Sequence, residues 1–546
     1  MKISLVASAL AVLASSAFAQ APQRGLTLFN PNFDQNTYLL DNNGQIVHTW
    51  NLTQNPGNTV YLEEDGTLLR SHQIPGGIGI GGKGGGVQRV RFDGSFSWEF
   101  PVANSLIQQH HDVLPMPNGN VMMIVWSKQT AADAIAAGRN PSLISSPTFF
   151  PEILIEYQQS GPTTGTEVWR WESMDHLVQD FDPTKPNFGV VADHPERIDI
   201  NFPPNVITNG DWLHGNSVSY DEQLDQLLFS VPFLNELWII DHSTTSAEAA
   251  GSTGGNSGKG GDLLYRWGNP AAYDAGTSAD QKLFNQHGGM FIEPGRPGAG
   301  NILVFNNQVP GPVQHSEVWE LTRQADAGGN YPLAPGAAFG PAAPTWSYAA
   351  PVVSDFNSGF LSSAQRMPNG NTMVCSGVQG WLFEVDPAGT KVWEYFNTLP
   401  AVGNKWIFKT RRYEHYLWSD TPSLSAAAGG TVQFDLACGS DFGGDFYLVL
   451  GSVSGTSPGT PINGELVPLV ADAYTNLTFS RANTGPFSQT FGALDALGRA
   501  SASLTVPAGI ASVLVGIEVN HAFVVFNTTS LTVTLASNAQ SLSIEP

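Results

Sequence analysis

The sequence predicts an all-β protein in which a six-bladed β-propeller is followed by a C-terminal β-sandwich. A strand-like run, a polar turn and a short strand that ends in tryptophan recur six times before residue 419. The 58 glycines, 37 prolines and 14 tryptophans, with a charged fraction of only 13%, suit many short strands joined by turns. Beyond residue 419 tryptophan disappears and Val, Leu, Thr, Ser, Ala and Gly dominate, which is typical of sandwich strands.

The N-terminus, residues 1–19, has the pattern of a secretory signal peptide. Lys2 supplies the positive start, Ile3 to Phe18 is mostly apolar, and Ala17-Phe18-Ala19 fits a cleavage site. No later apolar run is long enough to cross a bilayer. We therefore expect a secreted or periplasmic protein without a membrane span.

The propeller is expected over residues 20–419. The terminal tryptophans of its six repeats are Trp50, Trp98, Trp171, Trp267, Trp346 and Trp393. An inner pair of strands precedes each of the later repeats, so that a unit of four strands forms one blade. Two stacked sandwiches would explain the strands but not the recurrent tryptophan. The segment "KWIFKTRRYEHYLW" has strand character and no partner of its own, so we expect it to pair with the first blade and close the ring.

Two further segments complete the organisation of the chain. The glycine-rich stretch from Ile74 to Val87 lacks the lysine-serine ending and the helix of a phosphate-binding loop, which favours a flexible blade loop. Residues 420–546 should form the sandwich, whose role the sequence leaves open among attachment, stability and carbohydrate contact.

Three histidines occupy the same slot of three repeats, six to eight residues before a turn. They are His111, His214 and His287, and equivalent slots of a closed ring converge on its axis. Asn216 should share the strand face of His214. Ser362 holds the slot in the sixth repeat, with Gln365 just beyond it. His110 is one residue out of register, so its side chain is expected on the opposite face.

Converging imidazoles can act as nucleophile, as general acid or base, or as metal ligands. A secreted transferase, a zinc-dependent hydrolase or lyase, and a non-catalytic scaffold that binds glycan or protein are therefore the alternatives. The balance of 24 basic to 47 acidic residues disfavours nucleic acid and anionic membranes as partners. The oligomeric state is not indicated.

Several motifs make the chain similar to the bacterial arylsulfate sulfotransferase family. The resemblance covers about Thr27 to Tyr416 and rests on "HHDVLPMPNGN", "DWLHGNSVSYDEQLDQLLFS", "QHGGMF" with "GNILVFNN", and "SSAQRMPNGNTMVCSGVQGWLFEVDPAGTKVWEY". Turns of the "PNGN" type are common in propellers, whereas the "DWLHGNSVSYD" and "QHGG" segments are more discriminating.

The resemblance implies a six-bladed propeller that moves a sulfuryl group from an aryl sulfate to a phenol without a nucleotide donor or other cofactor. His287 matches the family's nucleophile, which becomes sulfated. His111 and His214 match its other channel histidines, and Asn216 matches the asparagine beside the second of these. No metal is implied.

One position departs from the family. The family carries an arginine on the return strand after the His-x-Asn segment, where it helps to hold the sulfate. This chain has Val231-Pro232 near that place. A neutral residue removes a bidentate anion clamp. The sequence leaves open whether another cation replaces it; the candidates are Arg89, Arg366, Arg411 and Arg412.

Overall fold

The computed structural model describes residues 20–63, 65–414, 416–509 and 514–546. The predicted signal peptide therefore lies outside the described residues. The protein is mostly β, as expected, and its α-helices are short: α1 (Ala131–Ala136), α2 (Ser246–Ala249) and α3 (Ala473–Ser480). In the described part of the chain, no helix is long and apolar enough to cross a membrane.

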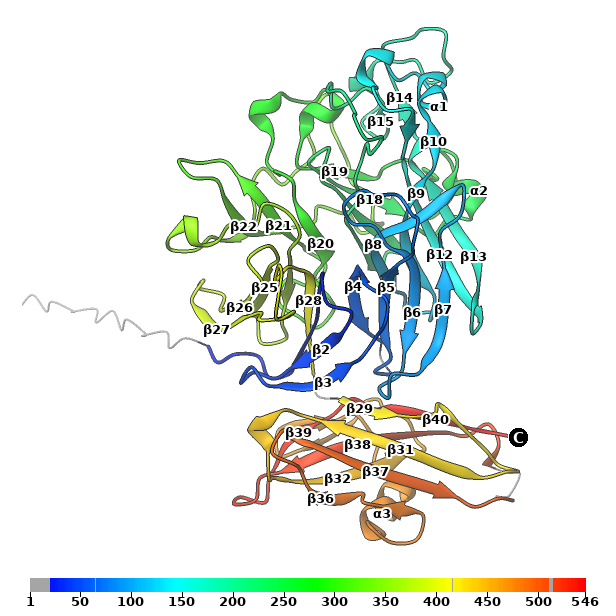
Figure 1. Cartoon of the computed structure of the whole chain (residues 1–546), viewed down its shortest axis with the longest axis vertical. Helices are drawn as coiled ribbons and strands as arrows, with labels where there is room; N and C mark the ends of the chain where they lie inside the picture. Colours follow the sequence, from blue (N-terminus) through cyan, green and yellow to red (C-terminus); the bar gives the residue numbers. More distant parts are fainter. Residues whose placement is uncertain (1–19, 64, 415, 510–513) are drawn as a thin grey trace, which may run out of the picture.

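Before residue 414 the described chain forms six four-stranded antiparallel sheets of the propeller type (Figure 1). From the innermost strand outward, the first sheet has the order β28 (Ile407–Tyr413), β1 (Leu26–Pro31), β2 (Thr37–Leu40), β3 (Ile46–Trp50). The second is β4 (Pro56–Leu62), β5 (Leu68–Gln73), β6 (Gly85–Val90), β7 (Phe96–Pro101), and the third is β8 (Ile107–Pro115), β9 (Val121–Ser127), β12 (Glu152–Gly161), β13 (Thr164–Glu172).

The remaining three sheets follow in chain order. The fourth is β16 (Ser217–Asp221), β17 (Gln226–Val231), β18 (Glu236–Asp241), β19 (Tyr265–Trp267), and the fifth is β20 (His287–Phe291), β21 (Ile302–Val309), β22 (His315–Leu321), β23 (Trp346–Tyr348). The sixth is β24 (Ser363–Arg366), β25 (Thr372–Ser376), β26 (Trp381–Val385), β27 (Lys391–Phe396). Neighbouring innermost strands contact one another in the closed order β4, β8, β16, β20, β24, β28 and β4 again.

The six predicted tryptophans all lie on the outermost strands of these sheets, and each one binds the next sheet. Every one of these indole Nε1 atoms donates a hydrogen bond of 2.6–3.0 Å to a backbone carbonyl in the following repeat, either in the connection before its outermost strand or at the first residue of that strand. The pairs are Trp50–Arg91, Trp98–Thr164, Trp171–Gly261, Trp267–Pro341, Trp346–Pro387 and Trp393–Asn42. The last pair joins the sixth sheet to the first. The recurrent tryptophan therefore connects each sheet to the next by a hydrogen bond.

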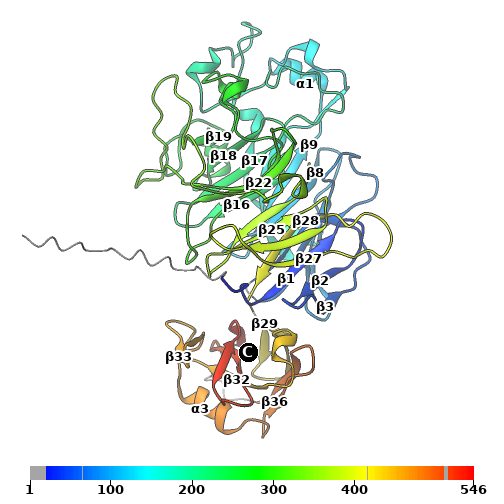
Figure 2. The same cartoon turned by 90° about the vertical axis from the view of Figure 1, so that its left-hand side faces the viewer.

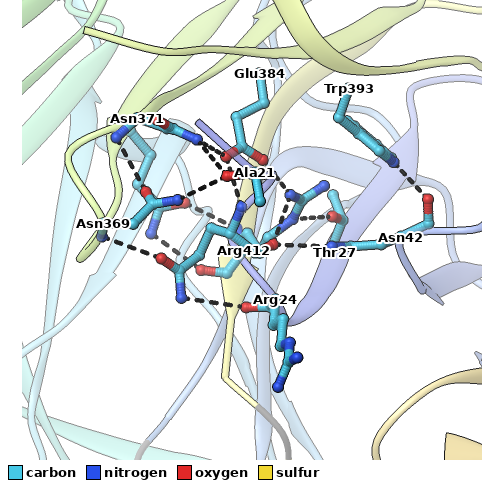
Figure 3. A network of polar contacts seen from close by, with 11 residues as sticks. Ala21, Arg24, Thr27, Asn42, Asn369, Asn371, Glu384, Trp393 and Arg412 are labelled. Carbon is cyan, nitrogen blue, oxygen red and sulfur yellow. Dashed lines mark hydrogen bonds and ion pairs between the residues drawn. The ribbon is translucent and has the colours of Figure 1, made fainter. Parts of the chain in front are cut away.

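The expected closing strand is confirmed for residues 407–413. β28 pairs antiparallel with β1 and is the innermost strand of the first sheet. A buried network around Arg412 fixes this closure (Figure 3). Arg412 Nη1 donates to Glu384 Oε2 of the sixth sheet at 2.5 Å, and its Nε donates to Thr27 Oγ1 of β1 at 3.0 Å. One side chain thereby links the two ends of the repeat region.

The last residues of the predicted closing segment belong to a separate set of sheets. β29 (Tyr416–Ser419) begins a four-stranded antiparallel sheet with β31 (Gly430–Ala437), β37 (Arg499–Val506) and β35 (Phe487–Ser488). The second sheet is mixed and contains β30 (Ser423–Ser425), β40 (Gln540–Glu545), β38 (Glu518–Phe526), β32 (Phe446–Ser452), β36 (Phe491–Ala493) and β39 (Val533–Ala536). Side chains of both sheets, such as Phe434 and Phe523, share one apolar core.

These C-terminal sheets lie against the first and second sheets (Figures 1 and 2). Trp418 Nε1 donates to the carbonyl oxygen of Gly66 at 2.7 Å. On the first sheet, Asp41 Oδ2 accepts from the hydroxyl of Ser440 at 2.6 Å. Trp418 also packs in an apolar cluster with residues of these two sheets, and Arg499 Nη1 donates to the carbonyl oxygen of Val47 at 3.3 Å. Side-chain contacts of several kinds therefore join the two parts, and in the described chain no continuous sheet does.

Loss of an indole hydrogen bond should destabilise the protein more where the tryptophan is more deeply buried. Trp171→Phe should lower the free energy of unfolding by about 1–3 kcal/mol more than Trp346→Phe, because Trp171 is fully buried and its loss leaves the Gly261 carbonyl unpaired. Trp346 is partly exposed, so water can replace its bond to Pro387. Chemical denaturation of both variants measures the difference. Equal losses would show that the indole bond contributes nothing beyond ring packing.

Candidate active site

The structure brings the three predicted histidines together at the inner strands of three neighbouring sheets. His111 lies within β8, His214 three residues before β16, and His287 at the first residue of β20. The ring centroids of His111 and His214 are 4.6 Å apart, with the rings nearly perpendicular. Phe408 of the closing strand contacts both His111 and His287, with centroid separations of 5.7 and 6.1 Å. The three imidazoles therefore share one site, in which His111 and His287 are buried and His214 is partly exposed, and the strand that closes the ring supplies part of its wall.

Hydrogen bonds fix the tautomer of His287. Its Nδ1 lies 2.9 Å from Asn307 Oδ1 and 3.0 Å from the backbone oxygen of Asn285. The amide of Asn307 is oriented by its own Nδ2, which donates to the carbonyl oxygens of Ser358 and Leu361. Both neighbours of Nδ1 are therefore acceptors, so Nδ1 carries the proton and Nε2 keeps its lone pair.

The surroundings of His214 favour its protonated, positively charged form, unlike those of His287. Its Nδ1 lies 2.5 Å from Oδ2 of the buried Asp211, three residues earlier in the chain. Burial opposes the charged ring, but the charge and the hydrogen bond of the adjacent Asp211 carboxylate outweigh it and raise the pKa of His214 above its usual value. Of the three histidines, His214 is consequently the one whose environment favours the charged form.

The other two imidazoles are held neutral. Burial, together with the charge of His214, lowers the pKa of His111 well below its usual value. Burial also lowers the pKa of His287 to about 4, against the opposing bond from Asn307. The site therefore combines a neutral ring with a free lone pair, His287, and a ring whose raised pKa favours the proton, His214. This is the pairing that nucleophilic attack on an anionic group requires.

The expectation that His110 points to the opposite face is wrong. Its Nδ1 lies 2.7 Å from Nδ1 of His111. The pairing of β8 with β9 shifts register between Gln109 and Val113, and His111 has φ +49°, so a bulge interrupts the alternation on which the expectation rested. His214 has φ +55° at its own slot. Such strained residues cluster at functional sites.

The glycine-rich loop lies directly over these histidines, which its sequence did not indicate. The carbonyl oxygen of Gly82 accepts from the backbone N–H of His111 at 2.8 Å and from Asn58 Nδ2 at 2.9 Å. Gly82 has φ +81°, and a Cβ there would collide with the ring of His111 at Cε1 and Nε2. Only glycine lets the loop approach this closely, so the loop covers the site.

The remaining predicted site residues form hydrogen bonds with the backbone or with other residues around the site, and not with the three imidazoles. Asn216 is buried beside His287, where its Nδ2 donates to the backbone oxygen of Gln286 at 2.7 Å. The hydroxyl of Ser362 bonds Ser358 Oγ and the N–H of Gly377, and thus stabilises its own turn. The amide of Gln365 bonds both backbone groups of Arg412 and joins β24 to β28.

None of the four candidate arginines replaces the missing clamp. All are ion-paired elsewhere: Arg89 with Glu63, Arg366 with Glu320, Arg411 with Glu293 and Arg412 with Glu384. Lys409 follows Phe408, but its Nζ bonds Asp112 Oδ2 at 2.7 Å. Val231 is fully buried on β17. Among the described residues, no group of three or more His, Cys, Asp or Glu side chains is arranged to hold a metal ion.

Sequence reasoning missed Asp211 and Asn307, which set the states of His214 and His287. Asp211 could have been found, since it stands three residues before His214 in "DWLH". Asn307 lies on the second strand of its sheet, 20 residues after His287, and no local pattern joins the two.

The contact between the loop and His111 predicts that replacing Gly82 by alanine lowers the stability of the protein. Gly82→Ala should be less stable than Gly76→Ala by about 1–3 kcal/mol, because the added methyl collides with the His111 ring. Gly76 is the matched control: its φ of +77° imposes the same backbone strain, but no heavy atom lies within 4 Å of its Cβ position. Thermal unfolding of the two variants compares them. Equal stability would mean that the loop does not rest on His111.

Comparison with known proteins identifies the family. Solved structures resemble the chain only distantly. A protein of unknown function from Bacteroides caccae has 12% identity over 71% of this chain and 99% of that chain, with a TM-score of 0.40. A streptogramin B lyase has 11% identity over 77% and 89%, with a TM-score of 0.33. A search of curated proteins found no match. The Arylsulfotransferase (ASST) family model matches residues 15–402, and the chain belongs to this family.

Proposed function

We propose that this protein is an arylsulfotransferase that transfers a sulfuryl group from an aryl sulfate to a phenol through a sulfated His287. The observation that carries the proposal is the free lone pair of His287 Nε2, fixed by the two acceptors Asn307 and Asn285 on Nδ1. The raised pKa of His214, caused by Asp211, supports it. Membership of the family favours this reaction over a scaffold or a metal-dependent hydrolase.

The chemistry follows from the charges of the site. His287 Nε2 attacks sulfur, an N–S bond forms as the ester S–O bond breaks, and the electron pair leaves with the phenolate. Sulfuryl transfer resembles phosphoryl transfer in that catalysis consists mainly of positioning and charge stabilisation. His214 offers the positive charge to the equatorial oxygens, which compensates for the absent arginine. An acceptor phenol then attacks the same sulfur and frees His287.

The architecture that we propose for this activity is a single closed ring of six blades that ends with β28, followed by a C-terminal β-sandwich that begins with β29. The predicted boundary at residues 419/420 therefore moves to between Tyr413 and Tyr416, because β29 pairs with β31 and not with a blade. The closed order of inner strands and the six indole bonds support the ring. We further propose that residues 1–19 direct the protein to the periplasm or out of the cell. Its substrates are small aryl sulfates and phenols, and the route uses no cofactor.

A covalent intermediate should be detectable directly. Brief exposure to 4-nitrophenyl sulfate should add about 80 Da to the wild-type protein, and phenol should remove the adduct. His287→Ala should gain nothing. His194→Ala, a partly exposed histidine paired with Glu196, is the matched control and should behave as wild type. Intact-mass spectrometry makes the measurement. Loss of the aryl sulfate without any adduct, or an adduct that persists in His287→Ala, would contradict the proposal.

The two protonation states predict a bell-shaped pH profile for kcat/KM. The rate should rise with pH through about 4, where His287 loses its proton, and fall again as pH rises through the raised pKa of His214. Asp211→Asn removes the carboxylate that raises this pKa, so the alkaline limb should move to lower pH while the acid limb stays. Steady-state rates across pH test this. An unmoved alkaline limb would exclude His214 as its origin.

A further inference from the structure

Behind His111 lies a buried chain of hydrogen bonds that the attack on sulfur does not use. His111 Nδ1 bonds His110 Nδ1 at 2.7 Å, and His110 Nε2 bonds Glu152 Oε2 at 2.7 Å. Glu152 and His110 are fully buried. The chain thus runs from the interior of the third sheet to the edge of the catalytic site.

Local structure holds the three side chains in line. The bulge at His111 places two consecutive histidine rings in contact. The His110 ring stacks on Trp126 with a centroid distance of 3.9 Å and an interplanar angle of 6°. Glu152 begins β12 directly opposite Trp126 in the ladder, so its carboxyl reaches the far nitrogen of the stacked ring. This geometry leaves His110 little freedom to rotate.

Each bond of the chain joins one donor to one acceptor, so the chain has two states. When the carboxyl of Glu152 holds a proton, it donates to His110 Nε2, His110 Nδ1–H donates to His111 Nδ1, and His111 Nε2–H points outward. When Glu152 is ionised, every bond reverses and His111 Nε2 becomes an acceptor. Moving between the states transfers one proton without charging either ring.

The surroundings favour the state with the proton on Glu152. Burial and the neighbouring Asp211 raise the pKa of Glu152 well above its usual value, against the opposing N–H of Gly215 at 2.8 Å. Burial and the charge of His214 keep the pKa of both His110 and His111 low. His111 therefore has no means of storing a proton as an imidazolium 4.6 Å from the charged His214.

We propose that Glu152 and His110 form a proton relay through which His111 Nε2 protonates the departing phenolate. The inference rests on the proposed sulfuryl transfer. As the S–O bond breaks, the phenolate takes the proton of His111 Nε2, His111 Nδ1 takes one from His110, and His110 Nε2 takes one from Glu152. The donor leaves as phenol and Glu152 becomes a carboxylate. The acceptor phenol later returns its proton along the same path as its oxygen attacks sulfur and the N–S bond breaks.

A leaving-group comparison separates this role from a structural one. Phenolate is a poor leaving group that needs a proton, whereas 4-nitrophenolate departs readily without one. Glu152→Gln keeps a donor toward His110 and an acceptor for Gly215, but its amide releases no proton. Glu156→Gln is the matched control, since Glu156 is a buried carboxyl on the same strand whose partners are Asn118, Asn120 and His242.

With phenyl sulfate as donor, Glu152→Gln should lower the rate of His287 sulfation by at least about 100-fold, the usual scale of general acid catalysis. With 4-nitrophenyl sulfate the rate should fall by less than about threefold. Glu156→Gln should change both rates equally. An equal loss with both donors in Glu152→Gln would overturn the relay. If Glu152→Gln does not fold, His110→Asn carries the same comparison, because it breaks the chain at its middle.

The proposed function fails in a different way. Absence of any His287 adduct in the wild-type protein, with either donor, would reject the sulfuryl transfer itself and the relay with it. If the wild-type protein forms the His287 adduct normally, but Glu152→Gln slows sulfation equally with phenyl sulfate and with 4-nitrophenyl sulfate, the result rejects the relay alone. A second readout needs no turnover: the infrared band of a protonated carboxylic acid should be present in the wild type at neutral pH and lost in Glu152→Gln. Its absence from the wild type would also overturn the relay.

Discussion

The bond from each outer-strand indole to the next sheet is the interaction on which the rest of the structure depends. It recurs at all six sheet junctions in the described chain, including the junction of Trp393 with Asn42 that joins the last sheet to the first. By setting the spacing of the sheets at the rim, it sets the spacing of their inner strands at the centre. The histidines of three different sheets approach one another because of that spacing.

Burial limits which side chains can be charged at the centre of the ring, around the three histidines. Four imidazoles and two carboxylates lie together with little access to water, and a buried charge persists only when it is paired. Asp211 pairs with His214, which is thereby charged. That charge, added to desolvation, keeps His111 and His287 neutral. The proposed nucleophile, His287, and the proposed electrostatic stabiliser, His214, are the same residue type and differ through their partners.

Much of this could be predicted from the sequence. The tryptophan repeat located all six outer strands, the histidine spacing located the converging rings, and an unpaired segment located the closing strand β28. These signals succeed because each repeat faces the same physical environment. The "PNGN" turns likewise marked the ends of β8 and β24.

What the sequence did not predict comes from contacts that break the repeat. His110 was placed on the wrong face because strand alternation fails at a bulge, which no residue pattern announces. Glu152 lies 42 residues from His110 and Asn307 lies 20 residues from His287, so only the folded sheet joins each pair. The sequence predicted only a flexible blade loop around Gly82, because its contact with His111 depends on the absence of a side chain.

The central claim is that neighbouring imidazoles hold different protonation states, and histidine-selective ¹⁵N NMR at neutral pH tests it most directly. The account predicts that His214 carries protons on both nitrogens, while His287 is neutral with its proton on Nδ1 and a bare Nε2. Variants that remove one histidine at a time assign the signals. A charged His287, or a His287 whose proton lies on Nε2, would contradict the account, because the atom assigned to attack sulfur would then have no lone pair.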